Sequence, residues 1–143
     1  MSITVAELTL ATRETIGTPF HHGGRVCGPN GGMDCGAIML YALQKLGIET
    51  YDKPFYNRGD GLADMFDVLT RNNFDKKATN DYVAGDVVLI RSSNIYHHLV
   101  YVTEFGTIIH AWFTTGLGKV VESTMLPEWE ENIQSVWRYR GLE

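Results

Sequence analysis

GTPFHHGG at residues 17–24 and DCGA at residues 34–37 are the stretches that decide the fold expected for this chain. Directly after the second stretch, residues 37–46 carry apolar side chains at the spacing of a well-buried helix. Asp34 is a good N-cap for that helix, which places Cys35 in its first turn. Unpaired backbone N–H groups and the positive end of the helix dipole lie there, and both favour a thiolate. Cys35 is therefore a candidate nucleophile, and the alternative is a small apolar residue buried at a helix start.

The composition predicts a globular chain without a polyanionic partner. Its 143 residues are 44% hydrophobic and 20% charged, as in ordinary folded proteins, and we expect residues 1–143 to form a single domain. A net charge of −5 disfavours nucleic acid and acidic membrane surfaces as partners. No apolar run approaches the roughly 20 residues of a membrane helix. The N-terminal residues lack the features of a signal peptide, so we expect synthesis in the cytoplasm and any export by another route.

The order of sequence patterns predicts an α+β fold, in which N-terminal helices pack on a central antiparallel β-sheet. A first helix is expected at residues 3–15, with an apolar stripe formed by Val5, Leu8, Ala11 and Ile16. Two further helices are expected at residues 35–46 and 62–71. Strands are expected at residues 86–91, 98–103, 107–113, 119–122 and 135–140, with a helical turn at 127–132. Glycine-rich or polar loops are expected at residues 20–33 and 72–83.

Two histidines in the predicted strands can complete a site around Cys35. His98 and His110 lie twelve positions apart on consecutive strands joined by a tight turn, so an antiparallel pairing brings them together on one face. A nucleophile at a helix start, a base on one strand and an orienting group on the next form a cysteine–histidine triad. His98 would accept the thiol proton, and His110 would hold its imidazole in the correct tautomer. The alternative is that these are half-buried histidines bonded to backbone carbonyls.

These motifs resemble the NlpC-type cysteine peptidases, papain-like enzymes that cleave the peptide stems of the bacterial cell wall. The family pattern is Gly-x-Pro-Tyr-x-x-Gly-Gly, Asp-Cys-Ser-Gly, a Gly-Asp-apolar strand, a strand that opens with His, and Ile-His-Ala. The corresponding segments of this chain are residues 17–24, 34–37, 85–89, 98–102 and 109–111. The resemblance implies a papain-like fold in which Cys35 is the nucleophile, His98 the base and His110 the third member.

Two departures from the family pattern concern the surroundings of Cys35. Gly36 and Ala37 replace Ser-Gly, which keeps the residues small but removes a hydroxyl. Phe20 replaces a tyrosine whose phenol lies beside the cysteine in relatives. The backbone N–H of Cys35 remains a candidate oxyanion donor. The residues that we expect around the substrate pocket are Phe20, His22, Asp34, Gly36 and His97.

His97 competes with His98 for the role of base. Many relatives carry His-x-x-Ile-Tyr on this strand, which fits a start at His97, whereas the spacing to His110 fits His98. Neighbouring strand residues point to opposite faces, so the two histidines do not share the role. We therefore predict His98 as the base, with His97 as the alternative.

Neither a metal ion nor another cofactor is expected. The histidine pair at residues 21–22 suggests a metal site with the strand histidines, but no Cys-x-x-Cys or His-Glu-x-x-His spacing supports one. Cys27 and Cys35 do not make a disulfide framework, and a nucleophilic Cys35 must stay free.

The resemblance implies a hydrolase that cleaves an amide bond of the peptidoglycan stem peptide through a thioester, such as the bond between D-glutamate and the diamino acid. Residues 17–25 look most like the branch encoded with bacteriophage tail genes, which implies phage tail proteins as partners and a location in the virion tail. Two alternatives stay open at this point. One is a structural tail protein that keeps the fold without activity, and the other is an amidase or acyltransferase that acts on a non-wall substrate.

Overall fold

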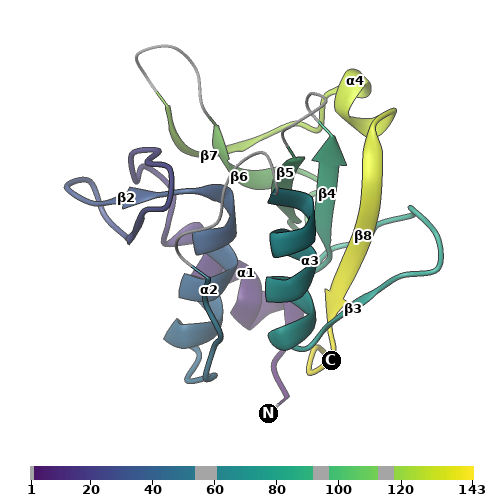
Figure 1. Ribbon diagram of the computed structural model, residues 1–143, viewed down its shortest axis with the longest axis horizontal. Coiled ribbons are helices and arrows are strands. Elements are labelled where there is room, and N and C mark those ends of the chain that lie inside the picture. Colours follow the sequence, from purple (N-terminus) through teal and green to yellow (C-terminus); the bar gives the residue numbers. More distant parts are fainter. Residues whose placement is uncertain (1, 54–60, 92–96, 113–117) are drawn as a thin grey trace.

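The long helices lie in the first half of the chain and most strands in the second (Figure 1). The computed structural model describes residues 2–53, 61–91, 97–112 and 118–143. The helices described are α1 (Val5–Arg13), α2 (Cys35–Lys45), α3 (Gly61–Arg71) and α4 (Pro127–Glu130). The strands described are β1 (Arg25–Val26), β2 (Gly32–Met33), β3 (Phe74–Lys76), β4 (Val87–Arg91), β5 (His97–Val102), β6 (Ile108–Trp112), β7 (Lys119–Ser123) and β8 (Ile133–Tyr139). This order confirms the α+β class. None of the described helices is long and apolar enough to span a membrane.

The structure corrects three expectations from the sequence. Helix α1 is shorter than the predicted span of residues 3–15, and Ile16, predicted on its apolar face, is 41% exposed. Residues 20–33, predicted to be a loop, contain β1 and β2, and residues 72–83 contain β3. These short strands carry no apolar alternation that would predict them. β1 and β2 pair with each other across a tight turn, whereas β3 pairs with the distant β8. Phe113, predicted at the end of a strand, lies outside the described residues.

Six strands form one antiparallel sheet with the order β3-β8-β4-β5-β6-β7. Strands β4 to β7 make a meander, as predicted, and β8 then returns to pair with β4 on the other side. The central strand β4 is covered on both faces, since its residues from Val87 to Ile90 are all fully buried. Strand β5, which carries both His97 and His98, therefore lies inside the sheet between β4 and β6.

Helix α2 packs against β5 and β6, and α1 packs against α2, so that the helices cover one face of the sheet (Figure 1). The main core cluster lies on this face and includes Leu99 and Tyr101 of β5. A second cluster on the opposite face includes Val100 and Val102, and Trp129 of α4 packs against it. Successive residues of β5 thus alternate between the helix face and the α4 face, as strand geometry requires.

Gly85 and Asp86, the pair that opens the predicted strand motif, have a structural role. Gly85 has a φ of +94°, and an added Cβ there would lie 2.8 Å from a side-chain carbon of Leu142. The fully buried Asp86 carboxylate accepts hydrogen bonds from Lys77 Nζ at 2.7 Å and Arg138 Nη1 at 2.8 Å. It also accepts a hydrogen bond from a backbone N–H in the turn before β4. A buried charge with these partners fixes the entry into β4, the central strand.

We predict that Asp86→Asn lowers the free energy of unfolding by about 1.5–3 kcal/mol, the usual contribution of a hydrogen bond to a charged group. The substitution keeps the shape of the side chain but leaves two cations facing a neutral amide. Urea unfolding followed by circular dichroism measures the change.

The matched control is Asp75→Asn, which removes a carboxylate that pairs with Arg140 between two exposed side chains. Solvent screens such a pair, so the control should leave the free energy of unfolding nearly unchanged. Equal effects of the two substitutions would contradict a stabilising role for the buried carboxylate of Asp86.

Candidate active site

Cys35 is the first residue of α2, and Asp34 caps this helix as predicted. The buried Asp34 accepts a hydrogen bond on Oδ1 from the backbone N–H of Ala37 at 2.9 Å. Its Oδ2 accepts a hydrogen bond from the backbone N–H of Gly23 at 3.2 Å, and Arg25 Nη1 lies 3.0 Å from Oδ1. One carboxylate therefore fastens the segment that leads into β1 to the first turn of the helix that carries the thiol.

A hairpin of β1 and β2 lies beside the start of α2. Arg25 extends the network from this hairpin, because its Nε donates a hydrogen bond to Asp52 at 2.8 Å while its Nη1 pairs with Asp34. A Cβ on Gly31 would lie 2.1 Å from the carbonyl oxygen of Val26, so the tight turn of the hairpin requires glycine at this position. The glycine-rich sequence before the cysteine is thus explained by close backbone contacts.

The Cys35 thiol is held in its neutral form by its surroundings. Burial raises its pKa to about 11, and the Asp34 carboxylate acts in the same direction, although the backbone N–H groups of Leu99, Cys35 and Gly36 lower it. The N–H groups at the helix start favour the thiolate, as expected, but desolvation outweighs them and the net shift is upward. The hydrogen bonding from Leu99 also shows that the sulfur lies against β5, at the residue that follows His98.

The structure brings His98 and His110 together. His98 Nε2 lies 2.7 Å from His110 Nδ1, and the two rings meet edge to face. Strands β5 and β6 pair Tyr101 with Ile109 and Val102 with Ile108. His98 and His110 both lie outside these two paired positions, and their contact is made by the side chains. Burial lowers the pKa of both imidazoles, and the neighbouring His110 lowers that of His98 further, so both rings are neutral at pH 7.

Two residues that the sequence did not single out complete the surroundings of the histidine pair. Ser123 Oγ on β7 lies 2.8 Å from His110 Nε2. The indole of Trp129 on α4 has its ring centroid 5.7 Å from that of His98 and 5.4 Å from that of His110. No signal in the sequence identifies either contact, because both depend on how β7 and α4 pack against the other strands.

The other predicted pocket residues occupy different positions. Phe20 is partly buried against the main core cluster, and His22 is exposed. His97 points away from the His98–His110 pair, and its enclosed Nδ1 has no hydrogen-bond partner among the described residues. Burial and the Arg91 cation lower its pKa. The histidine that contacts His110 is thus His98, which lies with Val100 on the α4 face, whereas His97 lies with Leu99 on the face that α2 covers.

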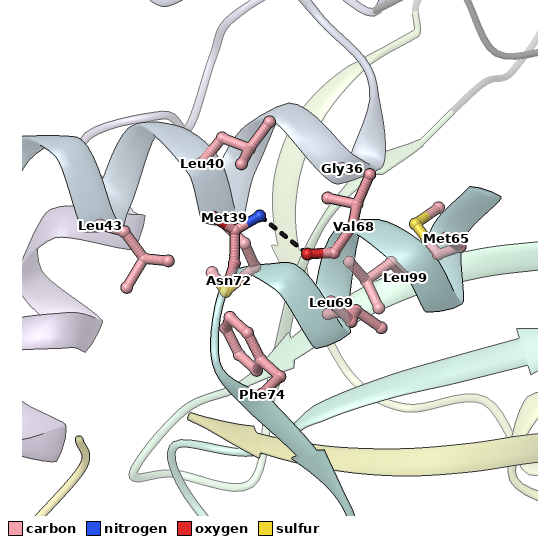
Figure 2. Close-up of a pocket in the computed structure, with 10 residues that line it drawn as sticks. All are labelled: Gly36, Met39, Leu40, Leu43, Met65, Val68, Leu69, Asn72, Phe74 and Leu99. Atoms are coloured by element: carbon pink, nitrogen blue, oxygen red, sulfur yellow. Dashed lines mark hydrogen bonds between the residues drawn. The ribbon is translucent and has the colours of Figure 1, made fainter. Parts of the chain in front are cut away.

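Gly36 lies in the packing behind the site. It lines a small apolar cavity of about 10 Å³ between α2 and α3, together with Leu99 (Figure 2). The other lining residues are Met39, Leu40, Leu43, Met65, Val68, Leu69, Asn72 and Phe74. This volume holds one water at most, so the cavity is a packing gap rather than a ligand site. Gly36 directly follows Cys35, so this packing holds the first turn of α2 against Leu99 of β5.

The polar groups that the structure describes near the site do not form a metal centre. Among the described residues, no cluster of three or more His, Cys, Asp or Glu side chains is arranged to hold a metal ion. Cys27 and Cys35 are both free thiols. The arrangement has instead the parts of a nucleophilic site: a thiol at a helix start and a hydrogen-bonded imidazole pair.

Comparisons with known proteins identify the family and the fold. Residues 17–138 match the model of the NlpC/P60 family. The fold is similar to the P60 domain of antigen MAP1204 from M. avium subspecies paratuberculosis, with a TM-score of 0.58, 16% identity, and coverage of 94% of this chain and 93% of that one. It is also similar to the NlpC/p60 domain of the peptidoglycan hydrolase SagA, with a TM-score of 0.51, 24% identity, and coverage of 84% and 90%. A search of curated proteins found no match. The predicted papain-like α+β fold is confirmed.

We predict that Asp34→Asn speeds the alkylation of Cys35 by iodoacetamide at pH 7. Asparagine keeps the helix cap, but the carboxylate that raises the thiol pKa is removed. Because only the thiolate reacts, the rate should rise by about three- to tenfold, the effect of up to one pKa unit. Mass spectrometry of the Cys35 peptide measures the rate separately from that of Cys27.

The control for this experiment is Asp52→Asn, which removes a carboxylate from the same Arg25 network but not the one beside the sulfur. It should not speed alkylation. A rate in Asp34→Asn equal to that of the wild type, in protein with an unchanged circular dichroism spectrum, would show that Asp34 does not control the thiol.

Proposed function

Since the chain belongs to the NlpC/P60 family, we propose that it is a cysteine peptidase that hydrolyses an amide bond in the peptide stem of peptidoglycan. The observation that carries the proposal is the match of residues 17–138 to the family model in a chain that places a thiol, Cys35, at the start of a capped helix. The fold is shared with SagA, which is a peptidoglycan hydrolase, and this supports the class of substrate.

The proposed reaction begins from a neutral thiol and a neutral imidazole. In the proposal His98, which is paired with His110 through Nε2, takes the proton of Cys35 as the sulfur attacks the carbonyl carbon of the substrate. His97 is the alternative base, because it lies with Leu99 on the face of the sheet that α2 covers. Proton transfer and attack then occur together, because burial disfavours a separate ion pair before substrate binds. The backbone N–H of Cys35 donates to the oxyanion of the tetrahedral intermediate.

The second half of the proposed reaction returns the site to its starting state. When the C–N bond breaks, the imidazolium of His98 gives its proton to the leaving amine, and a thioester to Cys35 remains. His98 then takes a proton from a water molecule that attacks the thioester. The C–S bond then breaks, the acyl group leaves as a carboxylic acid, and His98 returns the proton to the sulfur. The net change is one amide and one water converted to an acid and an amine.

The bond and the biological setting are finer parts of the same proposal. The family resemblance supports the bond between D-glutamate and the diamino acid of the stem. The likeness of residues 17–25 to the branch encoded with phage tail genes supports a tail-associated protein that cuts the wall locally during DNA entry. Tail proteins would then be its partners.

A structural tail protein on the same fold is the second candidate function. The neutral thiol with a pKa of about 11 favours it, because such a thiol is a poor nucleophile without a base that acts in concert. Phe20 favours it as well, since the phenol that lies beside the cysteine in relatives is absent. An amidase or acyltransferase on a non-wall substrate would use the same thioester chemistry.

We predict that the wild-type protein releases new peptide termini from purified peptidoglycan, and that Cys35→Ala and His98→Ala do not. Mass spectrometry of the products identifies the bond. His97→Ala is the matched control, because it removes the neighbouring imidazole that does not contact His110; it should retain cleavage. Addition of a nucleophilic amine separates a hydrolase, which still forms the free acid, from an acyltransferase, which forms the amide.

Two outcomes would contradict parts of this proposal. If the wild type releases nothing from several wall types, and Cys35 reacts no faster than a free thiol even when peptidoglycan is present, the structural role replaces the enzyme. If cleavage is lost in His97→Ala and kept in His98→Ala, the chemistry stands and the base is His97.

A further inference from the structure

We propose that Arg25 is a positioning residue that holds Asp34 against the start of α2 and offsets the charge that this carboxylate places beside Cys35. The inference rests on the peptidase function proposed above, because it concerns how the proposed nucleophile is kept reactive. Arg25 would act on the thiol as the counter-ion of Asp34 and would take no part in the making or breaking of bonds.

The guanidinium of Arg25 is shared between two carboxylates and a backbone oxygen. Its Nη1 lies 3.0 Å from Asp34 Oδ1 and donates a hydrogen bond to the carbonyl oxygen of Gly24 at 2.9 Å. Its Nε and Nη2 donate hydrogen bonds to the two carboxylate oxygens of Asp52 at 2.8 and 3.2 Å. The planar fork of an arginine suits this arrangement, whereas a lysine would present a single point charge. Strand β1, the cap of α2 and the segment after α2 therefore meet at one cation.

The burial of Asp34 makes a counter-ion important at this position. The Asp34 side chain is only 4% exposed, and its two oxygens accept hydrogen bonds from the neutral backbone N–H groups of Ala37 and Gly23. A buried carboxylate with neutral donors alone keeps its full negative charge where solvent screens it little. Desolvation lowers the pKa of Arg25, but Asp52 and Asp34 outweigh it and the net shift is upward, so the side chain is a cation at pH 7.

The balance between these two charges affects the thiol of Cys35. Asp34 is the charged group with the largest influence on the pKa of Cys35, and it raises this pKa. A positive charge paired with Asp34 reduces the negative field at the sulfur, so the thiolate forms more easily than it would beside Asp34 alone. An aspartate can thus cap the helix next to the nucleophile without its full unfavourable effect on ionisation.

The strands that pack against α2 supply imidazoles rather than full charges. Burial lowers the pKa of His97 and His98 on β5 and of His110 on β6, so these rings are neutral at pH 7. Glu14, which follows α1, pairs with Lys45 at the opposite end of α2. These groups therefore do not replace the cation at the start of the helix.

The test compares the rate at which iodoacetamide alkylates Cys35 in the wild type, in Arg25→Gln, in the double variant Arg25→Gln/Asp34→Asn and in Arg13→Gln. The last is the matched control, because Arg13 also pairs with two carboxylates and its side chain is 27% exposed, against 21% for Arg25. Mass spectrometry of the Cys35 peptide gives the rate between about pH 6 and 9, the range over which the thiolate fraction changes most simply. Circular dichroism shows whether each variant is folded.

At pH 7 we expect Arg25→Gln to slow alkylation by about two- to fivefold, a smaller effect than the opposite one of Asp34→Asn, because Asp34 has the larger influence on the thiol. Neutralising Asp34 in the same chain should reverse the slowing, so the double variant should react at least as fast as the wild type. Arg13→Gln should match the wild type. A merely structural loss acts in the other direction, since a loosened site exposes the thiol and speeds its alkylation, with a pH profile that bends near the ordinary thiol pKa of about 8.5.

Unchanged or faster alkylation in a folded Arg25→Gln protein would overturn the role of Arg25. A double variant that stays as slow as Arg25→Gln, or an equal slowing in Arg13→Gln, would overturn it as well. If Arg25→Gln does not fold, the double variant is compared with Asp34→Asn, from which it differs only in the charge at residue 25. The double variant should then be the slower of the two, and equal rates would overturn the inference.

Alkylation needs no catalytic activity, so the inference and the function on which it rests fail separately. A wild type that cleaves peptidoglycan, together with normal alkylation in Arg25→Gln, would keep the peptidase and overturn the role of Arg25. A wild type that cleaves nothing, together with slower alkylation in Arg25→Gln and its reversal in the double variant, would overturn the peptidase and support the charge balance at Cys35.

Discussion

The carboxylate of Asp34 connects the parts of the chain that have to meet at the site. It caps α2 through Ala37, holds the segment before β1 through Gly23, and pairs with Arg25, which in turn binds Asp52. The same carboxylate raises the pKa of the adjacent thiol. The interaction that positions the nucleophile therefore also suppresses its ionisation. Arg25 moderates this conflict, because its cation offsets part of the negative charge of Asp34.

Burial sets the protonation state of the whole site. The thiol has a raised pKa and both imidazoles have lowered ones, so no stable ion pair is expected before substrate binds. In such a site reactivity depends on proton transfer at the moment of attack, and this places a strict requirement on which ring nitrogen carries the hydrogen. A cysteine whose thiolate is already formed would be less sensitive to the tautomer of its partner.

The elements with strong local signals were predictable from the sequence, and those fixed by distant pairing were not. The cap at Asp34, the helix that follows it and the buried strand at Val87–Arg91 each have a pattern that is complete within a few residues. The diagonal contact of His98 and His110 followed from their even spacing across one tight turn. In contrast, β3 has the sequence Phe-Asp-Lys and is a strand only because β8 returns to pair with it. Ser123 was missed for the same reason, since its register with β6 is set by the sheet and not by a motif.

Some of the family motifs have a structural role and others a role in the site, and the sequence alone does not distinguish the two. Asp86 is fully buried between Lys77, which directly follows β3, and Arg138 of β8, so the Gly-Asp motif stabilises the start of the central strand β4. Gly31, before the cysteine, allows the close backbone contact in the hairpin of β1 and β2. Gly36 replaces the family serine and faces an apolar cavity with no room for a substrate, so a hydroxyl at this position would face packing rather than chemistry. Of the two departures from the family pattern, the one at Phe20 therefore bears more directly on activity, because it removes a polar group from the side of the thiol.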